Sequence, residues 1–192
     1  GVDRPNGSYE GAARPAATKS EPTLESLSIG GLGAPSSTWN YCSADGKLDF
    51  IVARYDPEGR SKEYRPWTWN GQGWVPKAPA SPRLLYGLER LSGAPLATVV
   101  LCEGEKAADA AQTLLPAYAC ITWSGGANAW SKSDFGPLKT RKVIIWPDAD
   151  EPGLKAAAGI EKALTEAGGN VVVAAVEADR PAGWDAADAL EE

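Results

Sequence analysis

Short apolar runs alternate with stretches of helical composition in the second half of the chain. Four runs have the length and continuous apolar character of buried strands: ATVVLC, AYACITW, RKVIIW and NVVVAAV. Three segments have the composition of helices: EKAADAAQTLL, EPGLKAAAGIEKALTEAGG and GWDAADALEE. Strands that are apolar throughout, rather than at every second position, are typical of a parallel sheet covered on both faces. Residues 97–192 are therefore predicted to form an α/β domain with helices on both faces of a parallel sheet.

Residues 38–96 show a different pattern, in which turn signals separate short segments of strand character. LDFIVARY and KEYRPWTW are predicted to be the arms of a hairpin, with ADGK before it, DPEG between its arms and WNGQGW after it. We therefore expect a small β-rich lobe here. Residues 1–37 are rich in Gly, Pro, Ala and Ser and are predicted to be a flexible linker or tail, in which the short apolar stretch LESLSI is a candidate to dock as one turn.

The composition excludes several kinds of site. The chain has no His, which removes Ser-His and Cys-His catalysis and every His-ligated metal. Its three cysteines, Cys42, Cys102 and Cys120, are widely spaced, so neither a zinc site nor a disulfide framework is expected. Any metal must therefore be held by oxygen ligands, which favours Mg²⁺, Mn²⁺ or Ca²⁺.

The sequence also bears on location and processing. It has no run of about 18 apolar residues, so we expect no transmembrane helix, and its first residues lack the apolar core of a signal peptide. We expect a cytoplasmic protein that does not engage a membrane. Because the chain contains no Met at all, we also expect it to be a processed or excised piece of a longer protein.

Charge is distributed unevenly along the chain. The net charge of −6 argues against a simple nucleic-acid binder. However, residues 38–96 carry slightly more Lys and Arg than Asp and Glu, whereas residues 97–192 carry about twice as many acidic as basic residues. This asymmetry is compatible with a lobe that contacts a nucleic-acid backbone beside a lobe that binds metal.

Acidic residues follow the predicted strands of the second half. Glu103 follows VVLC, Asp148 and Asp150 follow VIIW, and Asp185 begins the last predicted helix. Ligands of open parallel sheets bind beyond the carboxyl ends of the strands, and positions i and i+2 can point to one place. A divalent cation would resolve the repulsion between such carboxylates. Alternatively, the acids favour helix N-termini through the macrodipole, which accounts best for Glu151.

Four segments together resemble the TOPRIM domain, which topoisomerases share with primases of the DnaG type. These are VVLCEGEKAADAA, WSGGANAW, VIIWPDADEPGLKAA and GWDAADAL. Their sequences are most similar to those of the TOPRIM domains of phage and plasmid primases and primase-helicases. LDFIVARYDPEGRSKEYRPWTW and RLLYGLERL resemble the subdomain that precedes TOPRIM in primases. The resemblance implies a Rossmann-like TOPRIM fold over residues 97–192. It also implies Mg²⁺ or Mn²⁺ held by Glu103, Asp148 and Asp150, with Asp185 as the closest match to a further acid.

The chain departs from the family in two ways. Many primases have an Asp four residues after the motif Glu, where this sequence has Ala107. The zinc-binding domain of primases is also missing, so no zinc is expected. Further candidates for contact with nucleotide or DNA are Lys106, Arg54, Lys62, Arg65, Gly125 and Gly126, each with a plain solvent or turn role as the alternative. Most of the eight Trp are expected in the core, and Trp67, Trp69 and Trp74 remain candidates for base stacking.

The resemblance implies a primase catalytic core that polymerises NTPs into short RNA primers on single-stranded DNA. Such a core would serve phage, plasmid or mobile-element replication, with a replicative helicase in the same polypeptide or in trans. Two alternatives remain open: a TOPRIM nuclease of the OLD-like type, and a non-catalytic nucleotide- or DNA-binding module of a replication protein.

Overall fold

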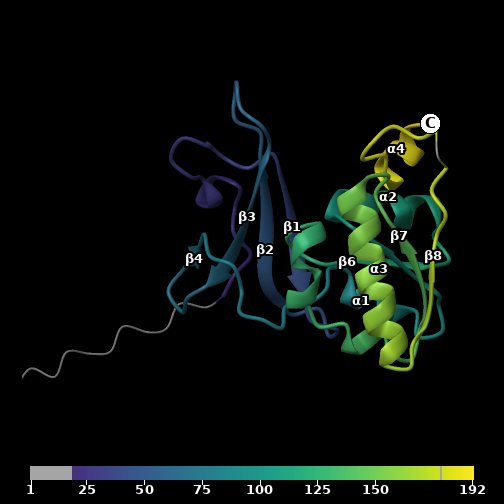
Figure 1. Ribbon diagram of the computed structural model, residues 1–192. Coiled ribbons are helices and arrows are strands. Elements are labelled where there is room, and N and C mark those ends of the chain that lie inside the picture. The colour runs from purple at the N-terminus through teal and green to yellow at the C-terminus, as the bar shows by residue number, and fades with distance from the viewer. Residues whose placement is uncertain (1–18, 178) are drawn as a thin grey trace, which may run out of the picture.

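The structure, a computed structural model, describes residues 19–177 and 179–192. It consists of a β-rich lobe and an α/β lobe that lie side by side (Figure 1). Residues 1–18 of the predicted tail lie outside the described residues. The described remainder of that segment contains a short 3-10 turn, η1 (Glu25–Leu27), whose Leu27 side chain is buried against the first lobe. This part of the predicted tail therefore belongs to the core of the lobe.

The β-rich lobe is one antiparallel sheet in the order β1-β2-β3-β4. Its strands are β1 (Ser37–Cys42), β2 (Leu48–Tyr55), β3 (Glu63–Trp69) and β4 (Trp74–Val75). β2 and β3 are the two arms of the predicted hairpin, and Arg54 pairs with Tyr64 across them. Because side chains alternate between the faces of a strand, this register places Arg54 and Tyr64 on the same face.

The two faces of this sheet pack against different partners. One face meets the N-terminal segment and buries Leu27, Ile51, Ala53, Tyr55 and Trp67. The other turns toward the second lobe and buries Tyr41, Phe50 and Val52 beside Trp39, Leu84 and Tyr86. The sheet is thus covered on both sides, and one covering is the other lobe.

The α/β lobe contains the four predicted strands as a parallel sheet in the order β6-β5-β7-β8. Its strands are β5 (Val99–Cys102), β6 (Ala119–Thr122), β7 (Lys142–Trp146) and β8 (Asn170–Val173). β5 and β7 are neighbours, with Cys102 paired to Trp146 at their ends. The residues that follow these two strands therefore meet at one edge of the sheet.

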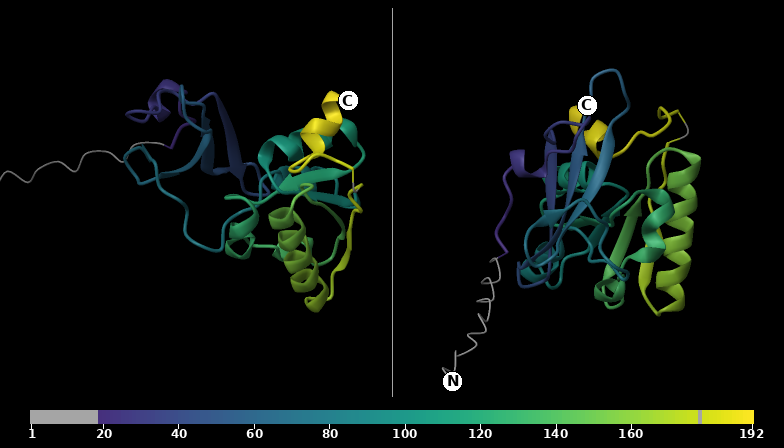
Figure 2. Two further views of the ribbon diagram at one scale, coloured as in Figure 1. Left: turned by 45° about the horizontal axis from the view of Figure 1, so that its top comes forward. Right: turned by 90° about the vertical axis from the view of Figure 1, so that its left-hand side faces the viewer.

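Helices cover both faces of this sheet, as the apolar strands predicted. The helices are α1 (Leu88–Gly93), α2 (Glu105–Leu114), α3 (Glu151–Glu166) and α4 (Ala186–Glu191), with 3-10 turns η2 (Ala127–Lys132) and η3 (Gly136–Leu138). Val99 and Leu101 of β5 point to the core formed with α1 and α3, whereas Val100 and Cys102 point to the core formed with α2 and α4. The left view of Figure 2 shows α2 and α4 on one side of the sheet and α3 on the other.

Helix α2 carries the polar contacts between the lobes. The Tyr41 hydroxyl of β1 donates to Oε1 of Glu105 at 2.7 Å, and the Trp39 indole N–H donates to Oδ2 of Asp109 at 3.1 Å. The second oxygen of Asp109 accepts from Tyr86 at 2.9 Å and from Arg90 at 2.6 Å. These bonds hold the β-rich lobe against the first turns of α2.

Within the described residues, the structure has no helix that is both long and apolar enough to cross a membrane.

Candidate active site

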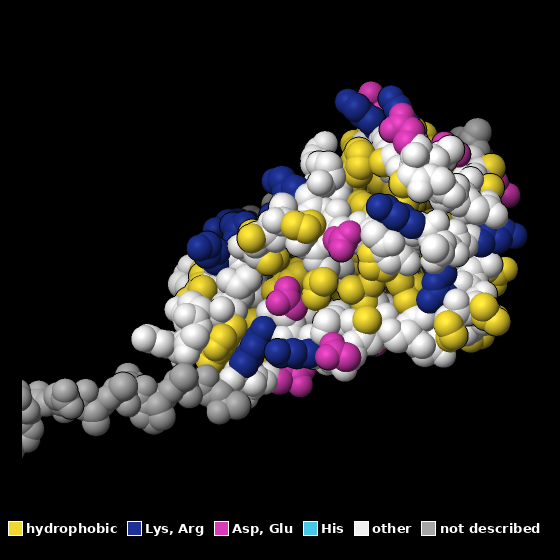
Figure 3. Space-filling model, turned by 90° about the horizontal axis from the view of Figure 1, so that it is seen from below, with side chains coloured by type: hydrophobic (Ala, Val, Ile, Leu, Met, Phe, Trp, Pro, Cys, Tyr) yellow, Lys and Arg dark blue, Asp and Glu magenta, His cyan; other side chains and the backbone are white. Residues whose placement is uncertain are grey.

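A cleft with a volume of about 730 Å³ opens between the two lobes. One wall consists of β2 and β3, and the other consists of the carboxyl ends of β5 and β7 with the beginnings of α2 and α4. Of the predicted site residues, the lining contains Arg54, Lys62, Glu103, Lys106, Gly125, Gly126, Asp148 and Asp185, and lacks Arg65 and Asp150. Figure 3 shows the molecule from below, on the side away from the Asp150 end of α3, where acidic and basic side chains are interspersed among apolar ones.

Glu103 follows β5 and is half-buried in this cleft. Its Oε1 accepts the backbone N–H of Ala127 at 3.0 Å, whereas its Oε2 is buried without a hydrogen-bond partner in the described structure. Burial raises the pKa of the Glu103 carboxyl, and the Ala127 N–H only partly opposes this. Oε2 is therefore a buried acceptor that a cation or a donor on a ligand could satisfy.

Asp148 follows β7, the neighbour of β5, as the sequence predicts for a shared strand edge. Burial, reinforced by the negative charges of Glu103, Asp185 and Asp150, raises the pKa of Asp148 to about 8. The described residues offer this carboxylate no ion pair. The elevated pKa therefore has two causes, which are desolvation and the gathering of like charges.

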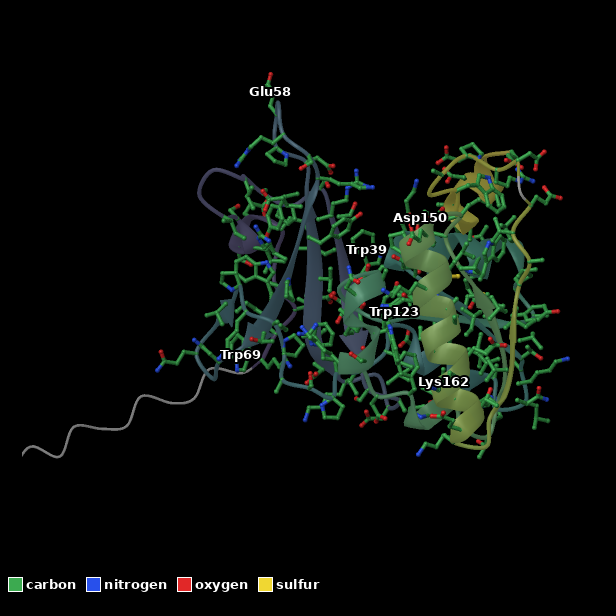
Figure 4. All side chains as sticks on the ribbon, in the orientation of Figure 1. Trp39, Glu58, Trp69, Trp123, Asp150 and Lys162 are labelled. Atoms are coloured by element: carbon green, nitrogen blue, oxygen red, sulfur yellow. The ribbon has the colours of Figure 1, made fainter. Side chains whose placement is uncertain are left out.

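Asp150 is the N-cap of α3. Its Oδ1 accepts the N–H of Gly153 at 2.7 Å, and Glu151 is the first helical residue, in the first turn where the sequence predicts an acid favoured by the helix macrodipole. Figure 4 shows Asp150 at the upper end of α3. A metal-ligand role for Asp150 stays a prediction, with only Oδ2 left outside the cap.

Gly153 explains how the acids can approach one another. A Cβ at this position would lie 3.0 Å from Oε2 of Glu103, 3.1 Å from Oδ1 of Asp150 and 2.8 Å from the carbonyl oxygen of Asp148. Oxygen atoms from three positions thus surround the point that a side chain would occupy. We did not single out Gly153 from the sequence, where a Gly in the first turn of a helix after PDADEP was the available signal.

Asp185 reaches the cleft because its segment is hydrogen-bonded to the loop after β7. The N–H of Ala149 donates to the Trp184 carbonyl at 2.9 Å, and the N–H of Gly183 donates to the Ala149 carbonyl at 3.1 Å. Asp185 itself is the N-cap of α4, in a reciprocal capping box with Asp188. The pairing of two distant segments places Asp185 beside Asp148, consistent with its contribution to the raised pKa of Asp148.

We tested whether these residues fit a divalent cation. Within the described part of the chain, no three Asp, Glu or Cys side chains are arranged as a ready-made metal centre. Mg²⁺, however, usually keeps several waters and is bound by one or two carboxylates together with substrate phosphates. The unsatisfied Oε2 of Glu103, the space left by Gly153 and the all-oxygen donor set fit such a partly hydrated ion.

The opposite wall of the cleft is basic and aromatic. Arg54 and Lys62 line it, and Arg54 is held by Asp56 through a bond of 2.7 Å from Nη2. Tyr64 lines the same wall, and we missed it in the sequence. The signal was available, because side chains alternate along the predicted strand and Tyr64 therefore lies on the face opposite that of Arg65.

Arg65 does not belong to this wall. It follows Tyr64 directly, so its side chain leaves the opposite face of the sheet, where it pairs with Glu63.

The three Trp candidates for base stacking also lie outside the cleft. Trp67 is buried and donates to the Tyr55 hydroxyl at 3.0 Å, and Trp69 packs edge-on against Trp74 at a centroid distance of 5.9 Å. None of the three lines the cleft.

The remaining predicted contacts surround Glu103. Lys106, in the first turn of α2, lines the cleft and pairs with Glu191 at 3.4 Å. Gly125 and Gly126 have φ of +96° and +70°, a conformation that favours glycine, and they precede the Ala127 N–H that binds Glu103. The glycine turn therefore positions a donor for the motif carboxylate.

One comparison with a solved structure supports the fold. A search of curated proteins found no match. The primase of Aquifex aeolicus, solved with its zinc-binding and RNA polymerase domains, has 17% sequence identity and a TM-score of 0.58, over 86% of this chain and 41% of that one. This chain thus spans less than half of that structure, and the likeness shows a shared α/β fold.

Two further solved structures have lower scores. The RNA polymerase domain of Mycobacterium tuberculosis primase DnaG is 18% identical, with a TM-score of 0.49 over 79% of this chain and 49% of that one. A bacteriophage T7 structure of lagging-strand DNA polymerase with primase domains of two gp4 subunits is 17% identical, with a TM-score of 0.45 over 76% and 67%. Residues 41–149, more than half of the sequence, match a described protein family, and the chain belongs to that family, Domain of unknown function (DUF6371).

Proposed function

We propose that this chain is a primase-type catalytic core of the TOPRIM kind, a nucleotidyltransferase that joins NTPs into short RNA primers on single-stranded DNA. One observation carries the proposal: a cleft whose basic and aromatic wall faces a set of carboxylates at the ends of adjacent parallel strands. Polymerisation of nucleotides needs both walls, since phosphates must be bound by cations and the reacting phosphoryl group must be neutralised. The fold shared with the Aquifex primase supports the same activity.

The residues divide the work between the two walls. Lys62 and the free side of Arg54 would bind template or primer phosphates, and Lys106 would bind the triphosphate of the incoming nucleotide. Glu103 and Asp148, with Asp150 and Asp185 beside them, would hold Mg²⁺ or Mn²⁺. When bound, the cation would orient the triphosphate and offset charge on its oxygens as the primer 3′-hydroxyl displaces pyrophosphate. The Gly125–Gly126 turn would keep Glu103 oriented through the Ala127 N–H.

The wider setting is also part of the proposal. Such a core would depend on other segments or partners to choose its template site, and a replicative helicase in the same polypeptide or in trans is the natural partner. Phage, plasmid or mobile-element replication would be its context, in the cytoplasm.

The test is primer synthesis on single-stranded DNA with labelled NTPs and Mg²⁺ or Mn²⁺. The unmodified protein should produce short labelled RNA, and Glu103→Gln should produce none. Glu166→Gln is the matched control, because Glu166 is an exposed residue at the far end of α3 and its substitution should leave synthesis unchanged. Cleavage of DNA or RNA without NTP incorporation would instead identify a nuclease. Nucleotide binding that Glu103→Gln leaves intact, with neither reaction, would identify a non-catalytic module.

A further inference from the structure

Tyr64 is an unusual aromatic residue for this protein. Its side chain lines the cleft and the residue is 39% exposed. Within the described residues, it is the only aromatic among the large hydrophobic residues that are exposed. The other Trp and Tyr side chains of this part of the chain are buried or partly buried in lobe cores and contacts. The ring of Tyr64 is therefore accessible to a ligand in the cleft.

The ring of Tyr64 packs against that of Trp39. The two rings are stacked, with centroids 6.2 Å apart and planes inclined by 29°. The Trp39 indole N–H is fixed in turn by Asp109 of α2 at 3.1 Å. One face of the Tyr64 ring is therefore covered by an aromatic ring that the second lobe holds in place. The rest of the ring faces the cleft.

The groups around Tyr64 match the parts of a nucleotide. Lys62, which directly precedes β3, lines the same cleft, and Arg54 is the cross-strand partner of Tyr64. Glu103, Asp148 and Lys106 lie on the opposite wall of the same cleft. Phosphates suit the cations and the proposed metal site, whereas a flat ring with one supported face suits the base.

We infer that Tyr64, supported by Trp39, is a stacking surface for a nucleobase bound in the cleft. The inference rests on the proposed function only in taking a nucleoside triphosphate as the ligand class. Every base has a π-face, so stacking supplies affinity with little choice among bases. The subsite should therefore accept purine and pyrimidine nucleotides, and pairing with a template would provide the choice.

The test compares ligands with and without a base. Binding of ATP, UTP and inorganic tripolyphosphate is measured in Mg²⁺ by isothermal titration calorimetry. Tyr64→Leu should weaken binding of ATP by at least about fivefold and leave tripolyphosphate binding unchanged, because stacking involves only the base. Binding of UTP to Tyr64→Leu should weaken by a smaller factor than binding of ATP. Tyr64→Phe keeps the ring and should bind all three within about twofold of the unmodified protein.

Trp69→Leu is the matched control, because Trp69 lies on the same strand but outside the cleft, and it should leave all three affinities unchanged. The inference is overturned if Tyr64→Leu binds ATP normally, or if it loses ATP and tripolyphosphate equally. It is also overturned if the unmodified protein binds ATP no more tightly than tripolyphosphate. A base-dependent loss in a protein that makes no primer would uphold the stacking surface and reject the proposed function. Primer synthesis by the unmodified protein, with no base-dependent loss in Tyr64→Leu, would support the proposed function and reject the stacking surface.

Discussion

Two Asp residues near helix α2 occupy opposite electrostatic situations. Asp109 accepts hydrogen bonds from Trp39, Tyr86 and Arg90, so neighbouring groups of the protein satisfy it. Asp148 lies among other carboxylates, and burial with their charges raises its pKa to about 8. The first arrangement joins the lobes, and the second opposes the folding of the chain that contains it. A carboxylate that the protein itself does not compensate indicates a ligand that does.

The strength of the interactions that stabilise the Asp109 carboxylate also depends on its exposure to solvent. Its side chain is 41% exposed, and that of Arg90 is 21% exposed, so solvent screens part of their attraction. The hydrogen bonds from Trp39 and Tyr86 add direction to this ion pair. Substitution of Asp by Asn removes one charge with little change of shape, and the same substitution at the two positions should therefore have opposite effects on stability.

The largest expected effect is on activity. Asp148→Asn should lower primer synthesis by at least about 10²-fold, because it removes a charge from the cluster that would stabilise the reacting phosphates. Rates are measured with saturating NTPs and template, and the far-UV circular dichroism spectrum confirms that the variant is folded. Retention of more than a tenth of the activity would show that Asp148 is not part of the metal site.

The second expected effect is on stability and has opposite signs at the two positions. Asp109→Asn should lower the free energy of unfolding by about 1–2 kcal/mol, since Arg90 loses its charged partner and one of the hydrogen-bond donors is left unsatisfied. Asp148→Asn should raise it at pH 8 when divalent cations are removed, since Asn lacks a carboxyl whose charge is opposed by burial and by the neighbouring acids. Urea denaturation in EDTA measures both. A loss of stability in both variants would remove the distinction between the two carboxylates.

The sequence predicted the acids of the cleft because strand ends are a local property. Continuous apolar runs located β5 and β7, and parallel strands end at one edge, so Glu103 and Asp148 could be brought together without knowledge of the packing. Asp109 could not be interpreted in this way. Its partners Trp39, Tyr86 and Arg90 come from β1, the connecting segment and α1, and their convergence depends on how the lobes dock.

The basic wall shows the same limit. Arg54, Lys62 and Arg65 were all predicted from their residue type and from the resemblance, although the alternation along β3 turns Arg65 to the face opposite that of Tyr64. Applying that alternation would have replaced Arg65 by Tyr64. The first-turn position of Glu151 is confirmed, whereas the N-cap role of Asp150 was not anticipated, because only the backbone shows which residue precedes the first turn.

The third prediction concerns pH. The pKa of Asp148 in the folded protein, about 8, lies above the usual range of an Asp carboxyl. The folded protein therefore holds this proton more tightly than the unfolded chain, and the resulting stability is present at low pH and is lost as pH rises toward 8. In EDTA, the free energy of unfolding should fall more steeply between pH 5 and 8 in the unmodified protein than in Asp148→Asn.

Addition of Mg²⁺ at pH 8 should reverse this loss in the unmodified protein, because an ion that binds only the folded state stabilises it. At about ten times its dissociation constant, the ion should add roughly 1.4 kcal/mol, and it should add little to Asp148→Asn. Parallel pH profiles for the two proteins would contradict the assignment of the raised pKa to Asp148. An equal response to Mg²⁺ would place the cation elsewhere.

The smallest expected effect is on the free energy of unfolding at Lys106, which differs in this respect from Asp109 and Asp148. Lys106 is near the acids in the cleft lining, yet its ion pair is with Glu191, and both side chains are more than half exposed. Such a pair contributes at most about 0.5 kcal/mol, so Lys106→Ala and Glu191→Gln should both leave the free energy of unfolding nearly unchanged. Only Lys106→Ala should weaken tripolyphosphate binding, by roughly two- to fivefold, because it alone removes a positive charge from the cleft. Equal weakening in both variants would mean that the ion pair, rather than the charge of Lys106, supports the site.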